Sequence, residues 1–193
     1  MPTPFSQSPA NLSRNPYGRI PVLVMPDGFT LYESRAICKF LSALLSLPYM
    51  PAPSSDLRAR ALFDQAEGAE ASHFSPAADT VSYERFAKPL RGLQTDEERV
   101  AEARGRLNAQ FGVLEEILGG QEYMAGGEFG LVDVWYLVMM ERLRGCGEGE
   151  LISGRKNLSA WWERCLGRPA VKKFLGELLT LEDIKKRLAV AKG

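Results

Sequence analysis

The stretch from Asn15 to Leu45 constrains the fold of this chain more than any other segment. Two short apolar or β-branched runs, Ile20 to Met25 and Phe29 to Tyr32, are separated by Pro26-Asp27-Gly28. Because Asp-Gly is a favoured pair for a tight turn, this pattern predicts a β-hairpin. Ser34 then opens a predicted amphipathic helix, whose apolar residues recur at a 3.6-residue period. The residues of this face are Ile37, Phe40, Leu41, Leu44 and Leu45.

The junction between the hairpin and the helix carries the candidate binding chemistry. A hydroxyl at a helix N-terminus, here that of Ser34, lies beside backbone N–H groups that can bind a ligand carboxylate. The neighbouring carboxylate of Glu33 can bind an ammonium group, so the pair suits the head group of an α-amino acid. The simpler alternative is that Ser34 only caps the helix and Glu33 only interacts with the helix dipole.

The motif N-P-Y-G-R-I-P-V-L at residues 15–23, followed by L-Y-E-S-R-A-I at 31–37, resembles the glutathione-site segment of the glutathione S-transferases. The resemblance is closest to the phi class of plants and fungi. It implies that Pro21 is cis and that the backbone at Ile20 binds the cysteinyl part of glutathione. It also implies that Glu33 and Ser34 hold the γ-glutamyl end. Arg19 stands where the phi pattern usually has Gln, within this glutathione-binding segment.

Gln7 falls near a position that is often Lys in the phi class. These two departures, Arg19 and Gln7, could weaken or re-tune glutathione binding. Fourteen residues precede Asn15, whereas a β-α-β unit takes about 30 or more. We therefore expect the thioredoxin-like part to be incomplete. The family's catalytic Ser, Cys or Tyr belongs to that first unit, and we assign no catalytic residue in this chain.

The second half of the sequence predicts helices. We expect a long helix from residue 57, with a break at Ser75-Pro76 and a second piece to about Phe86. Thr95 and Glu98 have the spacing of a capping box that opens a helix running to about Leu118. The predicted buried face of that helix consists of Val100, Ala103, Leu107, Phe111, Leu114 and Leu118.

Later motifs also resemble the family's helical domain. Y-M-A-G at 123–126 precedes Asp133, which we place at position N3 of an apolar, buried helix, where its carboxylate can bond the N-cap N–H. Trp161 and Trp162 are adjacent, so we expect one in the core and the other partly exposed. Gly167-Arg168-Pro169 should interrupt the last helices, and a charged amphipathic tail is expected from Thr180 to Lys192.

These elements give an α+β, mainly α, fold class. It consists of a truncated thioredoxin-like part, which is a β-hairpin plus a helix, and an all-helical glutathione-transferase C-terminal domain. Leu47 to Asp56 contains three prolines in ten residues and is typical of a linker. The expected domain limits are 1–46 for the partial glutathione-binding part, 47–56 for the linker and 57–193 for the helical domain.

Composition excludes several kinds of function. The 24 basic and 24 acidic residues cancel, so bulk charge favours neither nucleic acid nor anionic lipid. No apolar run reaches about 18 residues, so no membrane span is expected. The N-terminus lacks a secretory pattern, and the three cysteines have no C-x-x-C spacing. With one histidine and no cysteine cluster we expect no metal site, and we expect a cytoplasmic protein.

The resemblance implies a transferase that conjugates glutathione, as co-substrate, to a hydrophobic electrophile. The electrophile would be a xenobiotic in detoxification or an intermediate of secondary metabolism. It further implies a homodimer and makes Phe74 a candidate for the wall of the substrate pocket. Two alternatives stay open. One is a catalytically inactive interaction module, like the transferase-like domain of elongation factor 1-gamma. The other is a shortened form of a longer relative.

Overall fold

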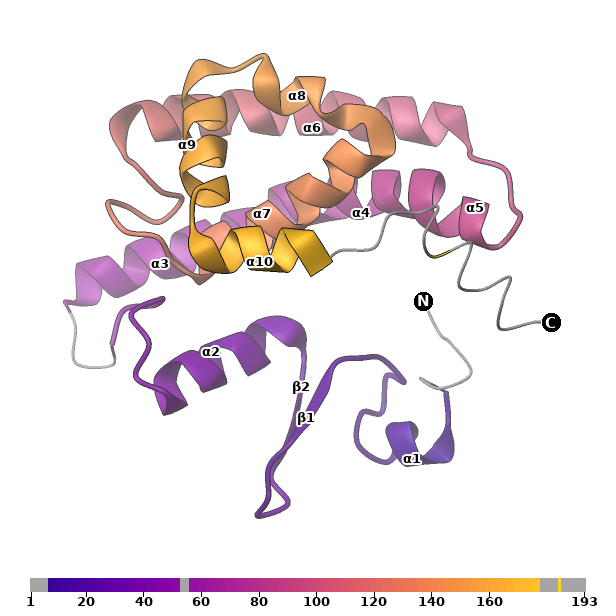
Figure 1. Cartoon of the computed structure of the whole chain (residues 1–193), viewed down its shortest axis with the longest axis vertical. Helices are drawn as coiled ribbons and strands as arrows, with labels where there is room; N and C mark the ends of the chain where they lie inside the picture. The colour runs from indigo at the N-terminus through magenta and orange to yellow at the C-terminus, as the bar shows by residue number, and fades with distance from the viewer. Residues whose placement is uncertain (1–6, 53–55, 178–183, 185–193) are drawn as a thin grey trace. The chain divides into compact units, whose positions relative to one another are not determined.

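The computed structural model describes residues 7–52, 56–177 and 184. The chain divides into two compact units, Met1–Ser55 and Asp56–Gly193. The first holds a hairpin and helices, and the second is built of helices (Figure 1). This arrangement confirms the predicted mainly helical α+β fold class. The predicted limits at 1–46 and 47–56 stay predictions.

The N-terminal unit is built around a two-stranded antiparallel sheet. Its elements are α1 (Pro9–Leu12), β1 (Val22–Val24), β2 (Thr30–Tyr32) and α2 (Ser34–Leu44). The strands pair Val22 with Tyr32, Leu23 with Leu31 and Val24 with Thr30. The Met25 N–H donates to the Phe29 carbonyl at 2.9 Å, and Gly28 adopts a φ of 88°, which glycine reaches without strain. The predicted hairpin is therefore confirmed, with a ladder shorter than the two apolar runs.

The apolar face predicted for α2 is only partly covered. Ile37 is buried and Phe40 contacts Phe29, with 5.3 Å between the ring centroids. Leu44 and Leu45 are 53% and 61% exposed, and Leu45 lies one residue beyond the helix. A hairpin of three residue pairs offers too little surface to bury five apolar side chains, so the far end of the face stays open.

The helical unit contains three π-helical segments, η1 to η3, among its described residues. Its elements are α3 (Leu57–Ala69), η1 (Glu70–Phe74), α4 (Ser75–Ser82), η2 (Tyr83–Ala87), α5 (Lys88–Leu90), α6 (Glu97–Gly120), α7 (Leu131–Leu143), η3 (Arg144–Glu148), α8 (Glu150–Ser153), α9 (Lys156–Leu166) and α10 (Pro169–Glu177).

Helix α6 forms one side of the core of this unit. Helices α4 and α9 pack on it, and α7 packs against α3, α4 and α9 (Figure 1). All six residues predicted for the buried face of α6 are buried, which confirms the 3.6-residue pattern. Helix α7 is also buried along most of its length, as its apolar sequence predicts.

The predicted break at Ser75-Pro76 is wrong, because the helical path continues through it. Segment η1 ends two residues before Pro76, and η2 ends two residues before Pro89. Proline lacks an N–H and its ring crowds the carbonyl four residues earlier. A wider π turn just before each proline lets the chain stay helical despite the bond that proline cannot donate.

The N-cap of helix α6 lies one residue later in the chain than Thr95, the N-cap of the predicted capping box. The N-cap is Asp96, whose carboxylate accepts from the Arg99 N–H at 3.1 Å. The Thr95 hydroxyl instead donates to the Glu84 carbonyl at 2.9 Å. The box of Thr95 and Glu98 is therefore wrong, because Thr95 is engaged by η2 and the next residue caps the helix.

The expectation that only one of the two adjacent tryptophans is buried is also wrong. Trp161 is fully buried and Trp162 is 6% exposed. Their ring centroids lie 6.2 Å apart, so the two rings also contact each other. Helix α9 ends at Leu166 and α10 starts at Pro169, which confirms the predicted interruption. The predicted tail from Thr180 to Lys192 lies outside the described residues, apart from Ile184.

Asp133 occupies position N3 of α7, as predicted, and its carboxylate accepts from the Gly130 N–H at 2.8 Å. It also accepts from the Met124 N–H at 2.9 Å and from the Trp161 indole at 2.7 Å. Burial raises the pKa of this carboxyl, although the three donors oppose that rise. The residue therefore joins three segments of the core.

Candidate functional site

The register of the hairpin brings the two halves of the candidate site to the same end of the sheet. Val22 lies opposite Tyr32, and the residues directly beyond this pair are Pro21 and Glu33. Opposed residues in an antiparallel pair have Cα atoms about 4.5–5.5 Å apart, and the next positions diverge only gradually. The hairpin therefore places the segment before Pro21 beside the start of α2, although the two are distant in sequence.

The segment from Arg19 to Pro21 is accessible. Arg19 and Pro21 are exposed, and Ile20 is 59% exposed. The Ile20–Pro21 peptide bond is cis, as the resemblance implied. Beside it, the rings of Tyr17 and Tyr32 meet edge to face with 6.0 Å between their centroids. The residues of this segment are thus exposed on the N-terminal unit.

Glu33 and Ser34 form the start of α2. Glu33 is the N-cap with a φ of 71°, a conformation that residues with a side chain rarely adopt, and Ser34 is the first helical residue. Both side chains are exposed, and the Glu33 side chain makes no capping hydrogen bond. The expectation that Ser34 is the N-cap is therefore wrong, because Glu33 takes that position; the ligand-binding role of the pair stays a prediction. Residues in sparsely populated backbone regions cluster at active sites and ligand-binding sites, so the conformation of Glu33 makes it a candidate binding position.

Sequence reasoning missed three side chains that hold the loop before Pro21. They are the amides of Gln7, Asn11 and Asn15, which donate to the carbonyls of Gly18 and Arg19. Asn15 enters the sequence analysis only as the first residue of the motif at residues 15–23, and Asn11 lies in a polar segment without a recognisable motif. The signal in the sequence was the spacing of the two asparagines, which are four residues apart and flank the end of α1.

Phe74 lies inside the helical unit. It is fully buried, and its ring contacts those of Tyr136 and Phe111, with centroids at 4.8 and 5.9 Å. This is a core position, and the role of Phe74 in a substrate pocket stays a prediction that its burial does not support.

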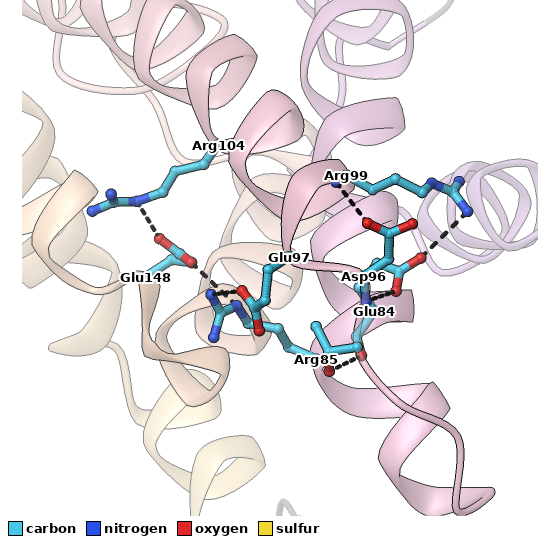
Figure 2. Close-up of polar contacts among 8 residues, drawn as sticks. Glu84, Arg85, Asp96, Glu97, Arg99, Arg104 and Glu148 are labelled. Carbon is cyan, nitrogen blue, oxygen red and sulfur yellow. Dashed lines mark hydrogen bonds and ion pairs between the residues drawn. The ribbon is translucent and has the colours of Figure 1, made fainter.

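The helical unit also holds a network of ion pairs around two buried carboxylates, those of Glu84 and Glu148 (Figure 2). Glu84 is fully buried on η2, where its carboxylate accepts from the Asp96 N–H at 2.9 Å. It pairs with Lys88 at 2.5 Å and with Arg99 at 3.3 Å. Burial raises the pKa of Glu84, but the Lys88 bond, the Asp96 N–H and the Arg99 charge together lower it below its usual value.

The second half of this network is centred on Glu148 of η3. Its carboxylate accepts from the Arg104 side chain at 2.8 Å and pairs with Arg85 at 3.6 Å. Arg85 also binds Glu97 at 2.8 Å, so it connects the start of α6 with η3 (Figure 2). Each buried carboxylate has cationic partners, and the arrangement is that of structural ion pairs linking η2, α6 and η3.

The three cysteines are free. Burial raises the pKa of Cys165 to about 12, and it raises the pKa of Cys146 as well, so both thiols are neutral near pH 7. In the part of the chain that the structure describes, no group of three His, Cys, Asp or Glu side chains is placed to hold a metal ion. No helix within those same residues has the length and apolarity to cross a membrane.

Comparison with known proteins gives the context of this geometry. Residues 37–169 match the family model of the glutathione S-transferase C-terminal domain, and residues 1–44 match that of the N-terminal domain. Glutathione S-transferase PM239X14 of Arabidopsis thaliana is 38% identical over 166 residues, covering 83% of this chain and 74% of that protein.

Solved structures agree with the sequence comparison. Glutathione transferase F7 from Populus trichocarpa has a TM-score of 0.82 at 27% identity, covering 89% of this chain and 80% of its own. Glutathione S-transferase I from maize, in complex with an atrazine glutathione conjugate, has a TM-score of 0.79 at 28% identity. That alignment covers 87% of this chain and 78% of the maize chain.

Proposed function

Because the chain belongs to the glutathione S-transferase family, with phi-like enzymes among its relatives, we propose that it binds glutathione and conjugates it to an electrophilic small molecule. The observation that carries the proposal is the hairpin register, which brings Pro21 and Glu33 to one end of the sheet. The proposed binding residues are Arg19, Ile20, Pro21, Glu33 and Ser34.

Each part of this site suits one part of the tripeptide. The exposed carboxylate of Glu33 provides a partner for the ammonium group of the γ-glutamyl residue. The Ser34 hydroxyl and the first N–H groups of α2 suit the carboxylate of the γ-glutamyl residue, because a helix N-terminus favours negative charge. Ile20 is exposed, and its backbone can hydrogen-bond the cysteinyl peptide groups between them.

In a substitution step the glutathione sulfur forms a bond to the electrophilic carbon. The thiol gives up its proton, and the carbon releases its leaving group, such as the halide of an aryl halide. A thiol attacks as its thiolate, so a nearby hydrogen-bond donor or positive charge is needed to lower its pKa. We assign no residue of this chain to that role. What the proposed site contributes is the position of the sulfur, because both ends of the γ-glutamyl-cysteinyl unit would be held.

The electrophile is proposed to be hydrophobic, since the similar maize protein was solved with a glutathione conjugate of atrazine. We further propose that the chain acts as a homodimer in the cytoplasm, in detoxification or in secondary metabolism. Light scattering on the purified protein would test the dimer, and a monomeric mass across the micromolar range would contradict it.

Glutathione binding is the first measurement. Calorimetry should give a dissociation constant in the micromolar to millimolar range, roughly −8 to −4 kcal/mol. The variant Glu33→Ala/Ser34→Ala should bind at least about tenfold more weakly, because it removes a charge-assisted partner and a hydroxyl. The control Ser153→Ala/Glu163→Ala removes the same two residue types from exposed positions of the helical unit and should bind like the wild type.

Two further results would decide between the proposals. If the wild type binds glutathione, loss of free thiol in the presence of an activated aryl halide should exceed the uncatalysed rate. A folded wild type that shows no glutathione binding would overturn the proposed function and favour an interaction module instead. Binding that survives unchanged in Glu33→Ala/Ser34→Ala would place the glutathione site elsewhere.

A further inference from the structure

Three side-chain amides converge on two successive backbone carbonyls just before Pro21. Gln7 Nε2 donates to the Gly18 carbonyl at 3.0 Å. Asn11 Nδ2 and Asn15 Nδ2 both donate to the Arg19 carbonyl, at 3.3 and 3.0 Å. We call Gln7, Asn11 and Asn15 the amide clamp. Its members lie on or beside α1, which thereby contacts a loop that follows it in the chain.

The two asparagines are held firmly themselves. Asn15 is 1% exposed and Asn11 is 6% exposed. The Asn15 side-chain oxygen accepts from the Tyr17 N–H at 3.0 Å, which fixes the amide so that its nitrogen faces the Arg19 carbonyl. Buried polar groups keep such bonds because an unpaired one is costly. The two asparagines are therefore buried donors, whereas Gln7 makes its contact with Gly18 from an exposed position.

Gly18 makes room for the third amide. A Cβ at this position would lie 2.3 Å from Gln7 Nε2, a distance that no side chain could accept without moving the amide. Gly18 also has a φ of 58°, in the region that favours glycine. The loop and the amide of Gln7 therefore fit each other only with glycine at this position.

A clamp on a carbonyl also orients the next amide. The peptide group is planar, so the Arg19 carbonyl and the Ile20 N–H share one rigid plane. Two donors on the Arg19 oxygen thus set the direction in which the Ile20 N–H points. In the same way, Gln7 sets the plane that carries the Arg19 N–H. Both planes belong to the segment proposed to hold the cysteinyl part of glutathione.

We propose that Asn11 and Gln7, together with Asn15, are positioning residues that preset the Arg19 and Ile20 peptide planes for the peptide backbone of the ligand. This inference rests on the proposed glutathione function and adds the device that organises its backbone half. The clamp lowers the cost of binding, because the loop does not have to be ordered when the tripeptide arrives.

The test uses isosteric acids in the whole 193-residue chain. Asn11→Asp and Gln7→Glu keep the size and the oxygen of each side chain but remove the donating nitrogen. The control is Ser13→Ala, since the exposed Ser13 hydroxyl only donates to the Ala10 carbonyl within the same segment. For each protein we would measure glutathione affinity by calorimetry, and backbone ¹⁵N order parameters with and without the ligand.

The expected result is local. Glutathione affinity should fall about tenfold in Asn11→Asp, and by a smaller factor in Gln7→Glu, with no change in Ser13→Ala. The order parameter of the Ile20 amide in the free protein should fall from about 0.85 towards 0.6, while those of Leu31 and Ile37 stay high. A merely structural role would lower the order parameters of the Ile20, Leu31 and Ile37 backbone amides together.

Each other outcome overturns the proposal. Variants that bind glutathione like the control would remove the positioning role and leave the proposed function intact. Affinity lost together with the order of Leu31 and Ile37 would reduce the clamp to a structural element; if Asn11→Asp unfolds the unit, the exposed Gln7→Glu decides the question. A wild type that does not bind glutathione would overturn both the proposed function and this inference.

Discussion

Asp133 shows how one buried carboxylate can hold separate segments of the helical unit together. It accepts from a loop amide at Met124, from the N-cap amide at Gly130 and from the indole of Trp161. All three donors are withdrawn from water and have this carboxylate as their partner. The net energy of the three bonds is modest. The larger effect on stability is the cost of leaving three buried donors unpaired if the carboxylate is removed.

Replacement of Asp133 by alanine should destabilise the protein strongly. Three buried donors would lose their acceptor at about 1–3 kcal/mol each, and partial relaxation leaves an expected total of about 3–5 kcal/mol. Asp133→Asn should cost less, because one oxygen remains. Urea unfolding followed by circular dichroism would measure both, with Glu128→Ala as a control at an exposed position of the same loop. A loss below about 1 kcal/mol for Asp133→Ala would contradict this account.

At the scale of elements, α9 receives its N-terminal cap from another helix. Its own N-cap residue, Arg155, offers no side-chain cap. The carboxylate of Glu115 on α6 instead accepts from the N–H groups of Asn157 and Leu158, at 2.9 and 2.8 Å. These backbone bonds, that of Asn157 foremost, lower the pKa of Glu115 against the opposing effect of burial.

The cap on α9 should make stability depend on pH in one direction. Because the pKa of Glu115 is lower in the folded state, its contribution is fully present above the unfolded value near 4.5 and is lost as pH falls through the folded value. Glu115→Gln should cost about 1 kcal/mol at pH 7, and the difference from the wild type should shrink below pH 4.5. Melting curves from pH 3 to 7 would show this.

The neighbouring Glu116 provides the matched control for this prediction. It is exposed on the same helix, so Glu116→Gln changes the same charge without touching α9. Its stability should stay within about 0.5 kcal/mol of the wild type at each pH. A gap between Glu115→Gln and the wild type that keeps its size down to pH 3 would show that the carboxylate charge is not what caps the helix.

Elements with a local cause could be predicted from the sequence. The Asp-Gly turn specified the hairpin, and the period of α6 identified all six of its buried residues. Features that depend on a distant partner could not. The N-cap of α6 is Asp96 and not Thr95, because the Thr95 hydroxyl donates to the Glu84 carbonyl. The chain stays helical at Pro76 because a π turn, η1, precedes it, and no local sequence pattern predicts that turn.

The candidate site divides in the same way. The motifs around Pro21 and Glu33 predicted the cis peptide bond before Pro21 and the start of α2, since both lie within a short, recognisable stretch. The amide clamp escaped, because an asparagine in a polar segment has many possible partners and only the folded loop selects the Arg19 carbonyl. The resemblance implies that Phe74 lines a substrate pocket; its ring packs against two aromatic rings in the core, and the pocket role stays a prediction.

At the scale of the whole molecule, the two compact units differ in how much apolar surface each buries. Among the described residues of Met1–Ser55, Ile37 is the one buried apolar side chain. In Asp56–Gly193 the buried set includes the α6 face, both tryptophans of α9 and most of α7. A two-stranded hairpin is marginal in water, whereas a helical unit with a continuous core can fold by itself.

We therefore expect residues 56–193 to fold as an isolated fragment and residues 1–55 not to. The helical fragment should keep a far-ultraviolet helical spectrum and melt cooperatively, because the Asp133 and Glu84 bonds lie within it. The 1–55 fragment should show a spectrum close to that of an unfolded chain, since its buried apolar area cannot offset the conformational entropy lost on folding. Thermal melting of both fragments by circular dichroism makes the comparison. A cooperative transition in 1–55 alone would mean that the amide clamp and the hairpin stabilise that unit far more than its small core suggests.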